Sequence, residues 1–96
     1  MIRITCINKD NGNHENPHLA ITYLGWIEDG TNAVGKWARL QLYRWIKEQG
    51  GIAYVMDAIK NRVYVKPAVS VMGNPYVRTE SDGKVTNNLL SLIECK

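Results

Sequence analysis

The sequence predicts a small α+β protein in which an antiparallel β-sheet packs against one amphipathic helix, in the order β-β-α-β-β-β. Three observations predict this class. Apolar and polar residues alternate with a period of two at residues 2–7 and again after residue 51, as in half-buried strands. One stretch between them has helical spacing. The helix and the later strands are segregated along the chain, which favours an antiparallel sheet. A length of 96 residues indicates a single domain spanning residues 1–96.

Two strands are expected before the helix. Residues 2–7 alternate between apolar and polar side chains, which predicts a half-buried strand. Residues 8–18 are polar and contain Gly12 and Pro17, as in a loop. Residues 18–26, HLAITYLGW, are rich in strand-forming side chains, and Glu28, Asp29 and Gly30 follow as a break. The N-terminal third therefore predicts a strand, a loop and a second strand.

The helix is predicted over residues 33–49, with Thr31 or Asn32 as its N-cap, because a short side-chain oxygen can accept a hydrogen bond from a free N–H of the first turn. One arc of the helical wheel is apolar and forms the predicted core face: Val34, Ala38, Leu42, Trp45 and Ile46. The other side is basic and carries one aromatic residue: Lys36, Arg39, Tyr43 and Lys47. Gly50 and Gly51 end the helix, since glycine enters the left-handed C-terminal cap without steric cost.

The second half predicts a meander of short strands. They are expected at residues 52–56, 62–66, 69–72 and 75–79, with turns at 60–61 and 73–74 and an interruption at Pro67. Residues 81–84, with Asp82 followed by Gly83, predict a tight hairpin turn. The tail carries Leu89, Leu90 and Leu92, which we expect to enter the core next to the N-terminal strand.

Composition limits the classes of protein. Hydrophobic residues make up 45% of the chain and charged residues 22%, which is typical of a folded domain. No apolar run approaches the roughly 20 residues of a membrane span, and the N-terminus becomes polar too early for a signal peptide. We therefore expect a cytoplasmic protein that does not bind membranes.

The net charge of +3 is unevenly distributed. Residues 34–66 hold seven basic residues against two acidic ones, which gives this segment a net charge of +5. The middle of the chain could therefore meet an anionic partner.

The tail resembles the closing signature of a bacterial domain-of-unknown-function family, number 3892. The matching residues are Tyr76-Val77-Arg78-Thr79, Asp82-Gly83, the run from Asn87 to Leu92, and Cys95. The opening Ile4-Thr5-Cys6-Ile7 is similar to the short first strand of that family. The family's aspartate before asparagine is Asn87 here, and its proline before the last cysteine is replaced. The resemblance implies a small single domain and supplies no catalytic residues.

A metal site and a disulfide are the two alternatives for the cysteines. Cys6, His14, His18 and Cys95 make a conceivable Cys2His2 set, and the histidines have the H-x3-H spacing of zinc sites. Neither cysteine lies in a C-x2–4-C pair, however. A disulfide between Cys6 and Cys95 would tie the two ends together, but a reducing cytosol opposes it. We therefore expect reduced cysteines, no metal and no other cofactor.

The sequence favours a binding module over an enzyme. It contains neither a G-x-S-x-G nucleophile elbow nor a glycine-rich phosphate loop. The candidate partner-binding residues are Lys36, Arg39, Tyr43, Arg44 and Lys47 on the basic helix face, and Arg78, Asp82 and Asn88 in the tail region. Three tryptophans add candidates for a protein interface.

A protein partner is favoured over nucleic acid, because the charge is modest and a charged helix face is commonly just solvated. The alternative function is a phage- or mobile-element-encoded inhibitor of a host nucleic-acid-processing complex. Dimerisation is possible on either interpretation.

Overall fold

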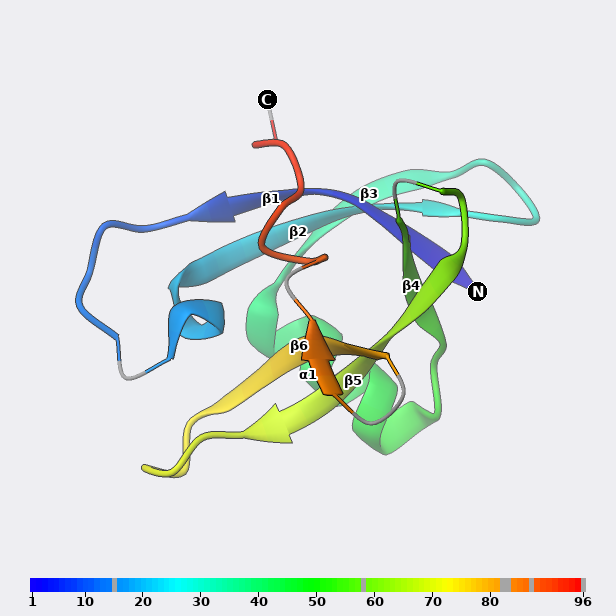
Figure 1. Cartoon of the computed structure of the whole chain (residues 1–96). Helices are drawn as coiled ribbons and strands as arrows, with labels where there is room; N and C mark the ends of the chain where they lie inside the picture. Colours follow the sequence, from blue (N-terminus) through cyan, green and yellow to red (C-terminus); the bar gives the residue numbers. More distant parts are fainter. Residues whose placement is uncertain (15, 58, 82–83, 87, 96) are drawn as a thin grey trace.

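The computed structural model describes residues 1–14, 16–57, 59–81, 84–86 and 88–95. Strands hold more of these residues than the helices do (Figure 1). The elements, in chain order, are β1 (Ile2–Lys9), the short 3-10 helix η1 (Pro17–Ala20), β2 (Ile21–Glu28), β3 (Val34–Ala38), α1 (Arg39–Gln49), β4 (Ala53–Met56), β5 (Arg62–Val69), β6 (Pro75–Ser81) and β7 (Lys84–Thr86). The α+β class is confirmed, and β1, β2, β4, β5 and β6 each cover most of a predicted strand. Residues 18–20, predicted as the start of the second strand, belong to η1 instead, because Pro17 and the Asn16 side chain, which accepts from the His18 N–H, begin a helical turn there.

The strands form a mixed sheet rather than the purely antiparallel one predicted. Within the described residues the sheet has seven strands in the order β3-β2-β1-β4-β5-β6-β7. Strand β4 pairs with β1 in parallel, at Ile2 with Ala53 and Arg3 with Tyr54, and the other neighbours are antiparallel. The chain passes through β2, β3 and α1 between these two strands, and such a crossover allows parallel pairing.

The first turns predicted for the helix are strand β3 instead. Asn32 has a left-handed φ of 58°, its N–H bonds to the Glu28 carbonyl, and Thr31 Oγ1 accepts from the Ala33 N–H. These bonds make residues 29–33 a turn between paired strands instead of a helix cap. Glycine at 35 and valine at 34 disfavour a helix. The helix therefore begins at Arg39, and Val34 is 72% exposed rather than in the core.

Two other boundaries depend on hydrogen bonding. Gly50 ends α1 in the predicted left-handed conformation, with φ 67°.

Strand β5 continues through Pro67, where the sequence predicted an interruption. Pro67 pairs with Val77 of β6, whereas the pairing of β5 with β4 covers only residues 62–64 of β5. Proline has no backbone N–H to donate, and at position 67 no hydrogen bond to β4 is lost, because the pairing of β4 with β5 has already ended. The expected strand at 69–72 is mostly a turn, closed by the Gly73 N–H on the Ser70 carbonyl. The predicted turn residues Asp82 and Gly83 lie outside the described part of the chain.

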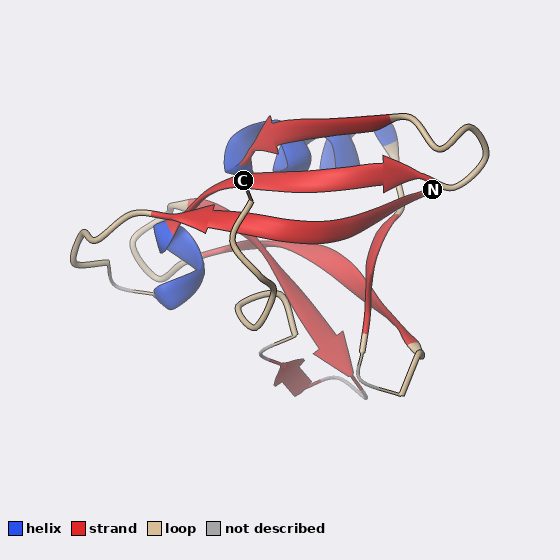
Figure 2. Ribbon diagram, turned by 90° about the horizontal axis from the view of Figure 1, so that it is seen from above, coloured by secondary structure: helices blue, strands red, loops and turns tan. Residues whose placement is uncertain are grey.

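The sheet curves around its core. Helix α1 contacts β2 and β3 on one arm of the sheet and β5 and β6 on the other, so the two arms bend toward one another (Figures 1 and 2). The core contains one side chain or more from each of β1, β2, β4, β5 and β6, together with Leu42 of α1 and Leu89 of the tail. Leu42 and Leu89 are both fully buried.

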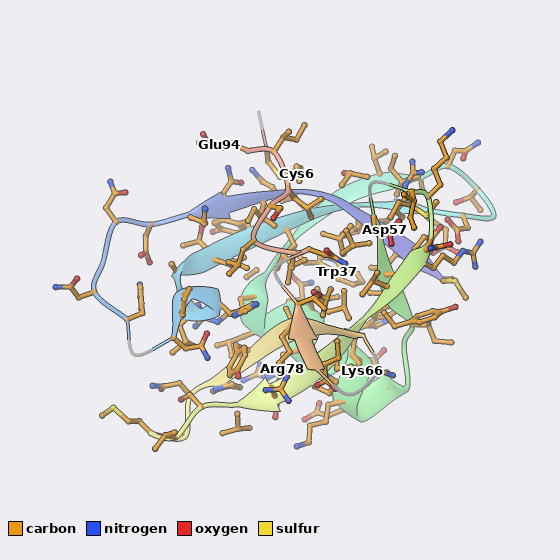
Figure 3. All side chains as sticks on the ribbon, in the orientation of Figure 1. Cys6, Trp37, Asp57, Lys66, Arg78 and Glu94 are labelled. Carbon is orange, nitrogen blue, oxygen red and sulfur yellow. A yellow bond between two sulfur atoms is a disulfide. The ribbon has the colours of Figure 1, made fainter. Side chains whose placement is uncertain are left out.

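The C-terminal tail lies beside β1, as predicted. The Ile7 N–H donates to the Ile93 carbonyl at 3.0 Å, and the Cys95 N–H donates to the Ile7 carbonyl at 3.0 Å. The Asn8 side-chain amide also donates to the Cys95 carbonyl at 3.1 Å. Figure 3 shows Glu94 of the tail near Cys6 of β1. Segments almost 90 residues apart are therefore joined by backbone hydrogen bonds.

Candidate functional site

Three tryptophans form a continuous cluster where β2, β3 and α1 meet. The ring centroids of Trp26 and Trp37 are 5.0 Å apart, and those of Trp37 and Trp45 are 5.3 Å apart. A side chain at Gly51 would collide with the Trp45 ring, because a Cβ there would lie 2.3 Å from it. A Cβ at Gly35 would likewise lie 2.4 Å from the Trp26 ring. Glycine at these two positions therefore allows the Trp45 and Trp26 rings to approach the backbone closely.

A groove of about 670 Å³ runs beside this cluster, between the end of β3 and the exposed side of α1. We call it the tryptophan groove. Its lining is Trp37, Ala38, Leu40, Gln41, Arg44, Trp45, Glu48 and Gln49. Four of these side chains, at positions 41, 44, 48 and 49, are polar and exposed, and none makes a hydrogen bond or ion pair with another described residue. The groove thus combines apolar rings with unused hydrogen-bonding groups.

The basic helix face predicted from the sequence does not form as one surface. Lys36 is on β3, where its Nζ lies 5.5 Å from the Tyr23 ring centroid and 3.3 Å from Asn8 Oδ1. Lys47 Nζ lies 5.6 Å from the Tyr43 ring centroid on α1. Tyr43 itself packs against the core, which its predicted place on the solvent side had not anticipated. Of the five predicted basic-face residues, Arg44 alone lines the tryptophan groove.

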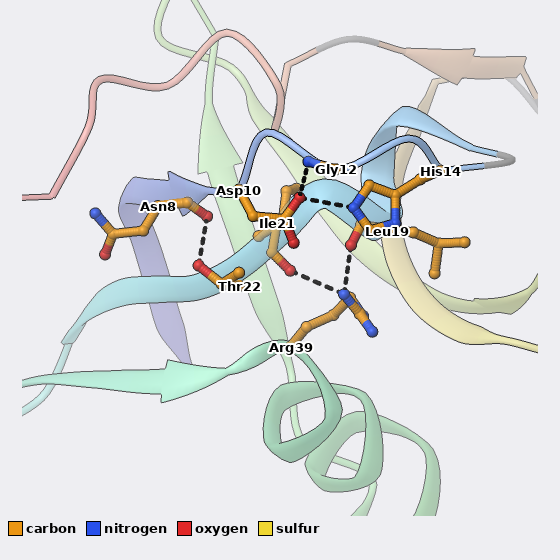
Figure 4. Close-up of polar contacts among 8 residues, drawn as sticks. All are labelled: Asn8, Asp10, Gly12, His14, Leu19, Ile21, Thr22 and Arg39. Atoms are coloured by element: carbon orange, nitrogen blue, oxygen red, sulfur yellow. Dashed lines mark hydrogen bonds and ion pairs between the residues drawn. The ribbon is translucent and has the colours of Figure 1, made fainter.

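Arg39 has a structural role. Its Nη1 donates to the Leu19 carbonyl at 2.6 Å and to the Ile21 carbonyl at 3.1 Å (Figure 4). These bonds hold the first turn of α1 against η1 and the start of β2. Nη1 is therefore committed to the backbone, and a contact between Arg39 and a partner stays a prediction.

Of the tail-region candidates, the structure describes Arg78 and Asn88. Arg78 Nε donates to Glu80 Oε2 at 2.9 Å, and its Nη1 lies 3.4 Å from the Tyr76 hydroxyl. The hydrogen bond to Glu80, followed by that to Tyr76, raises the pKa of Arg78 above its ordinary value. Arg78 and Lys66 are cross-strand partners and are both labelled in Figure 3. Asn88 is half-buried, and Asp82 lies outside the described residues. A groove formed by Arg78, Asp82 and Asn88 stays a prediction.

The prediction of reduced cysteines is wrong. Cys6 and Cys95 form a disulfide with a Cα–Cα distance of 5.0 Å. The tail runs beside β1 and brings together two residues separated by 89 positions. The bond lies over Gly25, where a Cβ would be 2.4 Å from Cys6 Sγ. Glycine at this position therefore makes room for the disulfide on the sheet.

The two histidines lie in different environments. His14 Nε2 is 2.7 Å from Asp10 Oδ1, and this contact, with the Gly12 N–H, lowers the pKa of the exposed Asp10 carboxyl (Figure 4). His18 is only 5% exposed, and its ring contacts Tyr76. Burial lowers the pKa of the His18 imidazole, and nearby Arg78 lowers it further. The two rings therefore do not share one site, and the described residues include no cluster of three or more potential metal ligands.

We expect the purified protein to bind no stoichiometric zinc. A thiolate is the form of cysteine that coordinates zinc, and both sulfurs are committed to the disulfide. Elemental analysis of the oxidised protein measures this directly. One zinc per chain, lost in a His18→Ala variant, would contradict the expectation.

The fold and this surface define a small single-domain α+β protein with an open, tryptophan-lined groove. The chain belongs to the DUF3892 family, described as proteins of unknown function, whose family model matches residues 3–93. No curated protein and no solved structure proved similar to the chain. In the part of the chain described here, the helices are too short and too polar to cross a membrane.

Proposed function

We propose that this domain is a non-enzymatic binding module and that a protein partner occupies the tryptophan groove. The observation that carries the proposal is the lining itself. Partly exposed tryptophan rings lie beside exposed glutamine, arginine and glutamate side chains that have no partner in the described chain. Tryptophan and arginine are enriched at protein interfaces, where the ring fills a pocket and the polar groups fix orientation.

The charge of the groove favours protein over nucleic acid. Arg44 and Glu48 line it together, so it offers no excess of positive charge to a phosphate backbone. The other cations on β3 and α1 do not form a row that could follow a phosphate backbone, because Lys36 and Lys47 lie beside different tyrosine rings and Arg39 binds backbone carbonyls. Gln41 and Gln49 can each donate and accept hydrogen bonds, which suits the peptide groups of a protein.

Site-specific photo-crosslinking tests the proposal. A photoreactive phenylalanine analogue at Gln41, expressed in the source cells, should form one discrete adduct with a protein. The matched control is the same analogue at Ile59, which is 77% exposed but does not line the groove, and it should not form that adduct. An adduct that nuclease digests, or identical adducts from both positions, would overturn the proposal.

A further inference from the structure

Strand β3 ends the sheet at one side. It pairs with β2 and is the outermost strand of the sheet within the described ranges. The Glu28 N–H donates to the Ala33 carbonyl at 2.8 Å, so Glu28 and Ala33 are a hydrogen-bonded pair of the antiparallel ladder. Hydrogen-bonded pairs recur every second residue, so Gly35 and Trp37 are the β3 residues that bond to β2. Val34 and Lys36 must then direct their N–H and carbonyl groups away from the sheet.

This edge has little of the usual protection. Natural edge strands are commonly blocked by proline, by charged side chains or by a covering segment. β3 contains no proline, and its single charge is Lys36. The ammonium of Lys36 is held over the sheet, near Tyr23 and Asn8. Val34, the residue next along the same face, is 72% exposed. The backbone groups of two residues are therefore accessible to another chain.

Hollows lie on both faces of the sheet at this edge. The tryptophan groove is on the face of Trp37. A second hollow, of about 310 Å³, lies beside the disulfide and includes Val34, Gly35 and Lys36 of β3. Gly25, under the disulfide, is the register partner of Lys36, and alternate residues of a strand point to opposite faces. Alternate side chains of an added strand would therefore meet one hollow and then the other.

Charge identifies the kind of segment that fits. Lys36 and Arg44 border the two hollows, and neither forms an ion pair with a described carboxylate. Glu48 is the single acidic residue in either lining. A second copy of this chain would bring lysine and arginine of both copies to the same edge. An acidic segment with apolar side chains at alternate positions complements both the charge and the hollows.

We propose that the protein partner binds as an extended acidic segment that adds a strand to the free edge of β3. This inference rests on the proposed function, because it assigns the conformation and charge of the partner in the same region. The added strand would exchange backbone hydrogen bonds with Val34 and Lys36. Its alternate side chains would enter the tryptophan groove and the hollow beside the disulfide.

Selection from a random ten-residue peptide library, with the full-length oxidised protein as bait, provides the probe. The enriched peptides should be acidic and should alternate apolar and polar residues. The affinity of each enriched peptide is then measured for the Lys36→Pro and Lys36→Thr variants. Both variants lack the amine, and only the first lacks the outward N–H. Binding should be about tenfold weaker for Lys36→Pro than for Lys36→Thr, since one backbone hydrogen bond is lost.

Controls separate this inference from the proposed function. Both variants should unfold at similar temperatures, because the pairing N–H groups of Gly35 and Trp37 are unchanged. Val34→Pro with Val34→Thr repeats the comparison if Lys36→Pro does not fold. Equal affinity for the proline and threonine variants, enrichment of peptides without acidic residues, or no enrichment at all would overturn strand addition. A peptide that binds both variants equally but loses affinity for Gln41→Glu would leave the groove as a protein site without strand addition.

Discussion

A chain truncated after Thr86 should be unfolded at room temperature. The deletion removes Leu89, a fully buried member of the core. It also removes two backbone hydrogen bonds to Ile7 and the disulfide to Cys6. Loss of a buried leucine side chain alone costs about 2–5 kcal/mol, and small domains are stable by only about 5–15 kcal/mol. Far-UV circular dichroism with urea titration should show no cooperative transition.

Point variants refine this test. Leu89→Ala should lower the free energy of unfolding by about 2–5 kcal/mol, because it leaves a cavity in the core. Ile93→Ala is the matched control, since Ile93 is 73% exposed, and it should change stability by at most about 0.5 kcal/mol. A truncated chain with the urea midpoint of the full chain would show that the tail does not contribute to the core.

Elements with an uninterrupted local pattern could be predicted from the sequence. Strand β1 and the paired parts of β4, β5 and β6 were expected from their period of two, and the end of α1 from its two glycines. The start of the helix was not, because residues 33–38 satisfy a helical wheel as well as a strand. What decides between them is pairing with β2, a non-local interaction, supported by the turn conformation of Asn32.

The parallel pairing of β1 with β4 could not be predicted from local patterns, because strand pairing is also a non-local interaction. Alternation identifies a strand but does not identify its neighbour or its direction. The curvature of the sheet follows from how α1 contacts both arms, and this too depends on the complete fold. The position of the tail beside β1 was predictable because both segments are apolar and a small core needs both.

The candidate site was predicted only in part. Arg44 and the tryptophans were named as candidates from the sequence, whereas Leu40, Gln41, Glu48 and Gln49, which line the same groove, were not. Trp37, Gln41, Arg44 and Glu48 do recur at helical spacing, which would have marked one face of a helix. This spacing was available within the predicted helix at 33–49, although the structure places Trp37 on β3. Arg39 appeared available in sequence, and only the fold reveals the two carbonyls that it binds.

The cysteines were predicted to be reduced because a cytoplasmic protein was expected, and no geometric argument entered that prediction. No spacing rule pairs two cysteines at opposite ends of a chain, so the sequence offered only the redox argument against the bond. The tail contacts with Ile7 and Asn8 place Cys95 beside Cys6, and this proximity is what allows the bond to form.

Removal of the disulfide should be among the most destabilising changes that leave the chain length intact. The bond closes a loop of nearly the whole chain, with a sequence separation of 89. The loop-closure entropy of the unfolded state predicts a loss of about 4–5 kcal/mol for a loop of this size. We therefore expect the Cys6→Ala, Cys95→Ala double variant to lose about this much free energy of unfolding under oxidising conditions. Urea unfolding of the two proteins measures the difference.

Dithiothreitol supplies the matched control, because its two thiols can reduce the disulfide while becoming oxidised themselves. The reductant should lower the stability of the native sequence toward that of the double variant and leave the double variant unchanged. Thiol titration of the unfolded, oxidised protein should find no free thiol, since both cysteines are in the bond. Two free thiols together with equal stabilities would mean that Cys6 and Cys95 remain reduced. The backbone hydrogen bonds to Ile7 would then hold the tail without covalent help.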